Sequence, residues 1–246
     1  MLPERVRDSL RRAGDVARPV RYYGKARFCP ACGKSSCCFR PYGIDPRQEP
    51  RGDAECVHCG ALERHRLLWL FVSTRTDLFD GAAKKMLHIA PEPCLESRFK
   101  QALGDNYLSA DLYDARAMVK MDITNIEYPD QSFDVIHCSQ VLQYVQDDRK
   151  AMSEVCRALK SDGWAVLHEP ITAEKTSQNP SIAEPEGRPG TGWHDIVWSY
   201  GPDFADRLRE AGFSVEVIKI NDLVQNDEAI RMGLTSAAGE IYYCTK

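Results

Sequence analysis

The chain has 246 residues, of which 43% are hydrophobic and 28% are charged, and its formal net charge is −4. This is an ordinary mixture for a soluble protein, and the length allows one mid-sized domain with an attachment. No apolar run approaches the ~20 residues that a transmembrane helix needs, and the N-terminus lacks the apolar core of a secretion signal. We therefore expect a cytoplasmic protein without a membrane partner.

The charge is unevenly distributed along the chain. Residues 1–70 carry 14 Lys and Arg against 8 Asp and Glu, whereas the remainder is acidic. Residues 1–24 have the pattern of a charged helical segment that Pro19 interrupts. A basic head of this kind can contact nucleic acid, but a solvated basic helix explains the same residues.

Six of the ten cysteines fall within residues 29–59. Cys29-Pro-Ala-Cys32-Gly and Cys56-Val-His-Cys59-Gly have the spacing of two metal knuckles, in which the glycine permits the tight turn. Two such turns complete a tetrahedral shell of four thiolates, as in zinc ribbons. The sequence therefore predicts a structural Zn²⁺ site made by Cys29, Cys32, Cys56 and Cys59, in a module spanning residues 25–62, with iron as the rival metal.

Three other residues near the knuckles leave alternatives open. One of Cys37 and Cys38 can replace a knuckle cysteine, but neither has the turn spacing, and we favour small packing residues. His58 lies inside the second knuckle, where we expect it to be exposed rather than a ligand. The segment Arg40–Asp53 is rich in proline, glycine and charge, so we expect a loop there.

Residues 63–76 show helical periodicity and begin the main domain, which we place at residues 63–246. His65 either reaches a substrate or is a surface residue at the start of this helix. From residue 84 onward, apolar runs of strand length alternate with helical patterns, which is typical of a parallel sheet wound with helices. Ligands of such sheets bind beyond the carboxyl ends of the strands, where Glu92, Asp111 and Asp122 occur.

The motifs of this region carry a resemblance to a known family. In order they are LHIAPEPC, SADL, KMDIT, QSFDVIHCS and, after a helix, LKSDG followed by a strand. Residues 84–171 resemble the core of a class I S-adenosylmethionine-dependent methyltransferase, a match that covers about a third of the chain. The resemblance implies an α/β fold, a Rossmann-like doubly wound seven-stranded methyltransferase sheet, joined here to the small N-terminal zinc ribbon.

The resemblance also implies S-adenosyl-L-methionine as cofactor and suggests its contacts. Asp111, at a strand end about 20 residues after the first loop, would accept hydrogen bonds from the ribose. Asp122 and Ile123 lie where the family contacts adenine. The remaining predicted cofactor contacts lie in the first loop, beside Asp111 and at the end of the fourth strand: His88, Ala90, Pro91, Glu92, Leu112, Cys138, Ser139 and Gln140.

The chain departs from the family pattern in two places. The family's first loop is usually rich in glycine, whereas His88, Ala90, Glu92 and Cys94 stand here; similar proteins with Ala-Pro-Glu in this loop are nevertheless assigned as methyltransferases. After the fourth strand, Gln140–Val145 lacks the histidines of similar bacterial sequences. A wound α/β domain with another ligand, or with none, remains the alternative.

Residues 172–199 are polar and contain several prolines and glycines, which predicts a lid or substrate loop. We expect substrate contacts from Trp193, His194, Trp198 and Tyr200. His194 either acts as the catalytic base toward an acceptor hydroxyl or amine, or only fixes the loop. Beyond it we expect a helix over 203–211, a strand over 214–220, a loop over 221–236 and a final strand over 240–244.

Three functions follow from these patterns. The first is methyl transfer to an oxygen or nitrogen of a small-molecule or glycan acceptor, which the acidic main domain and the tryptophans near His194 favour. The second is an RNA methyltransferase of the type that modifies bases of ribosomal RNA, using the basic zinc-ribbon head. The third is a non-catalytic zinc-binding scaffold. The acceptor, the methylated atom and the oligomeric state stay open.

Overall fold

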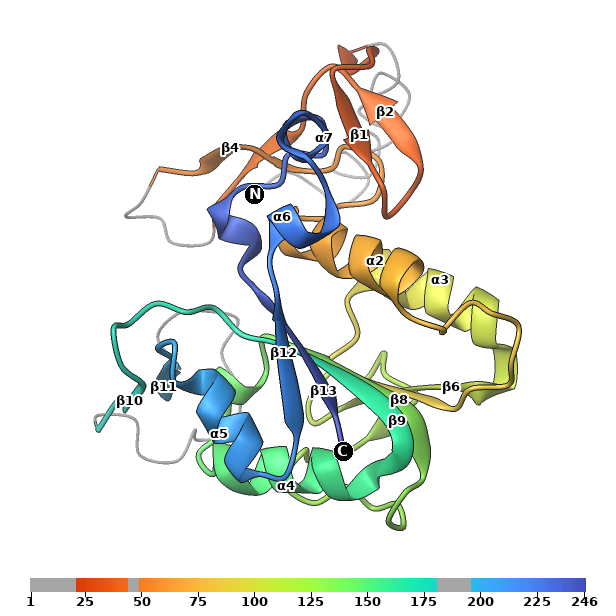
Figure 1. The fold of residues 1–246 in the computed structure, drawn as a ribbon. Helices are drawn as coiled ribbons and strands as arrows, with labels where there is room; N and C mark the ends of the chain where they lie inside the picture. The colour runs from red at the N-terminus through yellow and green to blue at the C-terminus, as the bar shows by residue number, and fades with distance from the viewer. Residues whose placement is uncertain (1–20, 44–48, 181–195) are drawn as a thin grey trace, which may run out of the picture. The chain divides into compact units, whose positions relative to one another are not determined.

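The computed structural model describes residues 21–43, 49–180 and 196–246. The chain divides into two compact units, one made of residues 1–67 with 225–238 and the other of residues 68–224 with 239–246. Helix α2 (Glu63–Arg75) runs from the first unit into the second (Figure 1). Within the described residues, no helix combines the length and the hydrophobicity that crossing a membrane requires.

The first unit contains two antiparallel hairpins, each of which leads into or carries a cysteine pair. They are β1 (Arg27–Cys29) with β2 (Lys34–Ser36), and β3 (Arg40–Tyr42) with β4 (Arg51–Glu55). The prediction of a loop over Arg40–Asp53 is therefore wrong for residues 40–42 and 51–53, which lie in strands. The weak strand propensity of this charged segment is overridden by pairing, with the flanking Phe39 and Ala54 side chains buried.

Residues 225–238 also belong to the first unit, although the sequence places them in the main domain. They form α7 (Asn226–Arg231) and the short helix η4 (Ser236–Ala238). Helix α6 (Ile220–Leu223), in the second unit, precedes them. The expected loop over 221–236 is thus a pair of short helices. The backbone N–H of Lys219 donates to the Asp222 carboxylate at 2.8 Å, which caps the first of them.

The second unit is built on a seven-stranded sheet in the order β12-β13-β9-β8-β5-β6-β7. Neighbouring strands from β5 to β9 are parallel, whereas β13 runs antiparallel to both β9 and β12. This confirms the predicted Rossmann-like doubly wound sheet. The strands are β5 (Met86–Ile89), β6 (Tyr107–Asp111), β7 (Val119–Lys120), β8 (Phe133–Ser139), β9 (Leu159–His168), β12 (Ser214–Ile218) and β13 (Ile241–Thr245).

Helices cover both faces of this sheet (Figure 1). On one face, α4 (Asp148–Ala158) and α5 (Phe204–Glu210) close an apolar core that includes Leu87, Ile136, Met152 and Leu208. On the other face lies α3 (Pro93–Leu103), whose Phe99 contacts the imidazoles of His88 and His137. Successive side chains along a strand therefore point alternately toward the apolar core under α4 and α5 and toward the face covered by α3.

The strand order of the sheet reverses at β5. Strands β6 and β7 lie on one side of β5, and β8, the next strand in the chain, lies on the other side. In open sheets this reversal opens a crevice at the carboxyl ends of the strands, where ligands bind.

The remaining elements of the second unit are short. They are η1 (Gly104–Asn106), η2 (Leu142–Tyr144), β10 (Ser177–Gln178) and β11 (Trp198–Ser199).

Candidate cofactor site and cysteine cluster

The loops that leave β5 and β8 both begin with a left-handed residue. Ala90 has φ 51° and Gln140 has φ 56°, which are values that favour glycine. The Ala90 N–H donates to the carbonyl of Ala110 at 2.8 Å, and the Gln140 N–H donates to that of His168 at 2.7 Å. The chain therefore makes a glycine-type turn at Ala90 although the glycine of the family pattern is missing.

The predicted ribose ligand, Asp111, ends β6 with a fixed carboxylate. Its Oδ1 accepts backbone N–H bonds from Tyr113 and Asp114, both at 2.7 Å. Among the described residues, no hydrogen bond reaches Oδ2, and the side chain is half-buried together with that of Leu112. One carboxylate oxygen thus orders the loop while the other keeps its capacity to accept hydrogen bonds.

The predicted adenine contacts lie after β7. Asp122 is exposed, and its Oδ1 accepts from both the N–H and the hydroxyl of Thr124 at 2.8 Å. Ile123 is 6% exposed and packs in the apolar core, so its side chain points away from the solvent-exposed edge. Asp122 is therefore the polar group of this pair that a ligand can reach.

At the carboxyl end of β8, the predicted contacts differ in their accessibility. Cys138 is buried in the core, and burial raises the pKa of its thiol well above the usual range. Ser139 is 6% exposed, and its hydroxyl makes no hydrogen bond within the described part of the chain. Gln140 is half-buried and begins the loop after β8. The Cys138 thiol therefore packs in the core, and Ser139 and Gln140 supply the polar side chains at this end of β8.

Glu169, which the sequence analysis does not single out, holds the loop after β8 by hydrogen bonds to its backbone. It follows β9, is fully buried, and its Oε1 accepts from the backbone N–H groups of Val141 and Leu142 at 2.8 Å each. Burial raises the pKa of its carboxyl to about 8, and the backbone hydrogen bonds oppose that rise only in part. The available signal was an acid directly after a predicted strand, as at Asp111.

The first-loop residues His88 and Glu92 bind each other rather than pointing to solvent. The His88 Nε2 and the Glu92 Oε2 are 2.7 Å apart, and His137, another residue not singled out, lies beside them. Burial lowers the pKa of His88. Burial alone would raise the pKa of Glu92, but the two imidazoles outweigh it and lower that pKa. Half-buried Ala90 and Pro91 remain in the loop between them.

The predicted substrate contacts are only partly described. Trp193 and His194 lie outside the described residues. The Trp198 indole N–H donates to the carbonyl of Val145 at 2.8 Å, and the Arg207 guanidinium stacks 4.6 Å from its ring. Tyr200 is fully buried, and its hydroxyl donates to Asp148 at 2.9 Å. This position fits a packing role for Tyr200 better than a substrate contact, while Trp198 stays half-exposed beside the loop after β8.

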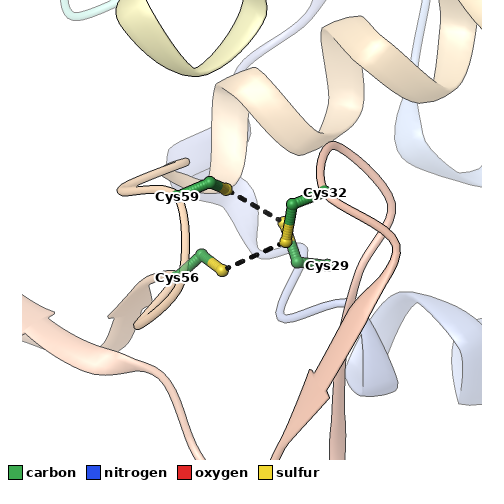
Figure 2. A group of neighbouring side chains, drawn as sticks. All are labelled: Cys29, Cys32, Cys56 and Cys59. Atoms are coloured by element: carbon green, nitrogen blue, oxygen red, sulfur yellow. Dashed lines mark hydrogen bonds between the residues drawn. The ribbon is translucent and has the colours of Figure 1, made fainter. Parts of the chain in front are cut away.

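The four knuckle cysteines converge in the first unit (Figure 2). Sγ of Cys29 lies 3.7 Å from that of Cys59, and Sγ of Cys32 lies 3.8 Å from that of Cys56. Four thiolates at the Zn–S bond length of 2.3 Å in tetrahedral geometry are about 3.8 Å apart. The donor set and its spacing therefore fit Zn²⁺ with a complete shell.

The neighbours of the cluster agree with the expected arrangement. Gly33 and Gly60 close the two knuckles with φ of 68° and 75°. His58 is exposed, with Nε2 3.2 Å from the Ser35 carbonyl, so it is not part of the cluster, as expected. The Sγ atoms of Cys37 and Cys38 lie 3.7 Å apart, and neither residue belongs to the four-cysteine cluster.

Comparison with known proteins identifies the central segment. Residues 84–167 match a family model described as a methyltransferase domain. Residues 84–167, about a third of the chain, are therefore a methyltransferase-domain segment. The matched residues begin just before β5 and end within β9, so they contain Ala90, Asp111 and Asp122. This confirms the resemblance on which the sequence prediction of the family was based.

Solved structures share the fold of the methyltransferase domain at low identity. An S-adenosylmethionine-dependent methyltransferase from Mesorhizobium loti is 16% identical, with a TM-score of 0.51, over 72% of this chain and 97% of that one. The [4+2]-cyclase SpnF is 17% identical, with a TM-score of 0.50, over 88% and 90%. No curated protein sequence matches the chain. Because one of these neighbours is a cyclase, the likeness establishes the fold and not the reaction.

Proposed function

We propose that the methyltransferase domain moves a methyl group from S-adenosyl-L-methionine to an oxygen or nitrogen of a small-molecule or glycan acceptor. The observation that carries the proposal is the carboxyl edge of the sheet. There the glycine-type turn at Ala90 and the anchored carboxylate of Asp111 end two neighbouring parallel strands at the point where the strand order reverses. Both residues lie in the segment that matches the family model.

Each predicted contact has a chemical role in this proposal. Asp111 Oδ2 accepts hydrogen bonds from the ribose hydroxyls, while Oδ1 stays bound to the backbone of Tyr113 and Asp114. The exposed carboxylate of Asp122 accepts from the exocyclic amine of adenine. The backbone at Ala90 and Pro91 approaches the amino-acid tail. Ser139 and Gln140 line the side where transfer takes place.

The cofactor supplies a methyl group already activated on a sulfonium, so the protein's main task is to position the acceptor and exclude water. The loop after β8 is suited to this task because it is held on two sides. Glu169 binds the N–H groups of Val141 and Leu142, and the Trp198 indole binds the carbonyl of Val145. His194 stays our candidate for the base that deprotonates the acceptor.

A compact acceptor is favoured over RNA by charge. The residues after position 70 hold more acidic than basic side chains, which repels a phosphate backbone. Trp198, half-buried beside the loop after β8 with Arg207 over its ring, leaves part of its indole exposed, and we expect that part to contact such an acceptor. We further propose that the Cys29, Cys32, Cys56 and Cys59 cluster holds a structural Zn²⁺ ion.

The cofactor assignment is tested by calorimetric titration of the full chain with S-adenosylhomocysteine. We expect micromolar binding, and we expect Asp111→Asn to weaken it by about 1.5–3 kcal/mol, or roughly 10- to 150-fold. Asparagine keeps the Oδ1 acceptor that orders the loop but replaces Oδ2 by a donor. Asp162→Asn, at an exposed position near the start of β9 and thus at the opposite end of the sheet, is the matched control. Absence of binding to the wild-type chain would favour a non-catalytic scaffold.

The acceptor class is tested by label transfer from methyl-labelled S-adenosylmethionine in a cell extract separated into RNA, protein and small-molecule fractions. We expect label in the small-molecule or glycan fraction. Label in RNA instead would support the alternative in which the basic head presents a ribosomal-RNA-type substrate. The Asp111→Asn protein is the control, since any enzymatic label must fall with it.

A further inference from the structure

A buried cluster of two imidazoles and a carboxylate lies on the α3 face of the sheet. His88 and His137 stand directly opposite each other in the parallel pair β5 and β8, and their side chains project to the same face. Glu92 precedes α3, at the position that caps the helix, yet its side chain makes no cap hydrogen bond. The carboxylate turns toward the two histidines instead.

The three side chains converge on one point. The Glu92 Oε2 is 2.7 Å from the His88 Nε2 and 3.5 Å from the His137 Nε2. The two imidazole rings stand edge to face with their centroids 4.8 Å apart. One nitrogen of each histidine and one oxygen of Glu92 all lie within 4.8 Å of one another. Ligand atoms of a tetrahedral metal ion at bond lengths of 2.0–2.2 Å are separated by about 3.4 Å, so a small adjustment brings all three onto one ion.

The cluster is incompletely satisfied by the protein itself. The side chains of His88, His137 and Glu92 are 0%, 1% and 11% exposed. Among the described residues, neither ring nitrogen of His137 makes a hydrogen bond, and neither does the Glu92 Oε1. Buried polar groups are almost always paired, because leaving one unpaired costs about 1–3 kcal/mol. A ligand of the cluster would remove this cost.

The remaining nitrogen of His88 has the kind of partner that metal-binding histidines have. His88 Nδ1 and the Tyr107 hydroxyl, on the neighbouring strand β6, are 2.9 Å apart. Such a contact on the far nitrogen fixes the ring orientation and leaves the Nε2 directed at a metal. Phe99 of α3 packs against both imidazoles and shields the cluster from water.

We propose that His88, Glu92 and His137 bind a divalent transition-metal ion of the Zn²⁺ or Fe²⁺ type, at a second site distinct from the cysteine cluster. Two neutral imidazoles and one carboxylate are ligands that such ions prefer, and the ion compensates the charge of the buried carboxylate. His88 and Glu92 flank Ala90, so the ion would brace the loop after β5 against β8. This site stands independently of the proposed methyl transfer.

The proposal is tested by metal analysis of the tag-free full chain after reconstitution with Co²⁺. We expect two ions per wild-type chain. We expect one ion, with intense thiolate charge-transfer absorption, in Glu92→Gln and in His137→Gln. The Cys29→Ser/Cys59→Ser protein should also hold one ion but show only the weak visible bands of nitrogen and oxygen ligation. Retained thiolate absorption in the Glu92 and His137 variants shows that the cysteine cluster is intact, and circular dichroism checks the sheet.

A conservative variant gives a second measurement. Tyr107→Phe leaves all three ligands in place but removes the hydroxyl next to His88 Nδ1, so Co²⁺ affinity at the second site should fall about 10- to 100-fold. A single ion per wild-type chain would overturn the proposal. A second ion whose binding is unchanged in both Glu92→Gln and His137→Gln would overturn it equally, because the ion would then lie elsewhere.

Discussion

The guanidinium of Arg66 donates a hydrogen bond of 2.9 Å to the carbonyl of Gly233, a residue 167 positions later in the chain. The same buried side chain donates to the carbonyls of Ala54 and Ala61 at 2.8 and 2.7 Å and stacks 4.2 Å from the centre of the Phe39 ring. Arg66 thereby joins the second hairpin, the end of the second knuckle and the segment 225–238 into one unit.

Replacing Gly233 should show how strongly this unit depends on that contact. Gly233 has φ 60°, and an added Cβ would lie 2.8 Å from the Phe39 ring. We expect Gly233→Ala to lower the free energy of unfolding of the first unit by about 2–4 kcal/mol, from the left-handed backbone and from overpacking. The measurement is urea unfolding followed by the thiolate absorption of Co²⁺ bound at the cysteine cluster.

Two controls accompany Gly233→Ala. Gly52→Ala meets no atom within 4 Å and should be nearly neutral. All four tryptophans lie after residue 67, outside residues 225–238, so indole fluorescence reports the second unit separately. A transition of the Co²⁺ signal that is the same in both variants would contradict the prediction.

Cys29→Ser should remove the metal of the cysteine cluster and destabilise the first unit, because three thiolates and a hydroxyl bind Zn²⁺ far more weakly than four thiolates. Colorimetric release of Zn²⁺ and the loss of Co²⁺–thiolate absorption measure this. Cys37→Ser is the matched control, since Cys37 is exposed and lies outside the cluster. If Cys29→Ser keeps the full thiolate absorption, the ligand set is wrong.

Ala90 should accept glycine but not a β-branched residue. Ala90 has φ 51°, so Ala90→Val should lower the free energy of unfolding by about 1–3 kcal/mol. Ala90→Gly should change it by less than ~1 kcal/mol, because relief of the backbone strain offsets the added conformational entropy of the unfolded chain. Urea unfolding followed by indole fluorescence gives both values. Ala83→Val, at an exposed loop position, controls for the larger side chain. Equal stability of the two valine variants would mean that Ala90 is not left-handed.

Glu169 should make the second unit less stable as pH rises. Its folded-state pKa of about 8 lies above the ordinary 4.5, so between these values the folded state binds more protons than the unfolded state. The stabilisation is complete below pH 4.5 and is lost as pH rises through 8, with a slope of at most ~1.4 kcal/mol per pH unit. Glu169→Gln, which keeps the acceptor for Val141 and Leu142, should remove this component of the pH dependence.

Urea titrations at several pH values between 5 and 9 would compare the wild-type and Glu169→Gln proteins. The same exchange at the exposed Glu127 should leave the pH profile of the wild type unchanged. Parallel profiles for the wild-type and Glu169→Gln proteins would show that Glu169 is ionised in the folded state throughout this range.

Patterns that are local in the chain were readable without coordinates. The two Cys-x-x-Cys-Gly turns bring their thiolates together through backbone geometry of a few residues, and the four sulfurs do converge. The apolar runs predicted the central strands, because a strand buried on both faces reads as a short continuous run. The strand-end acids Asp111 and Asp122 followed from the same rule of ligand position.

Other predictions failed where distant partners decide. Residues 40–42 and 51–53, expected in a loop, lie in strands, and most of 221–236 lies in short helices, because the pairing of β3 with β4 and the cap at Asp222 outweigh weak local propensity. The roles of Glu169 and His137 were missed for a related reason. His137 lies within an apolar run and Glu169 follows one, so neither stands out in the sequence. Only the contacts that each makes with neighbouring segments show what it does.

The sequence by itself therefore predicted the family of the central segment, its alternation of strands and helices, and the four cysteines that converge, since each depends on short-range spacing and periodicity. Only the tertiary structure decided that Glu92 turns away from its helix toward His88 and His137, and that residues 225–238 join the first unit through Arg66. Contacts between residues 45 or 167 positions apart leave no periodic trace in the chain, because their geometry is set by how the sheet and helices pack.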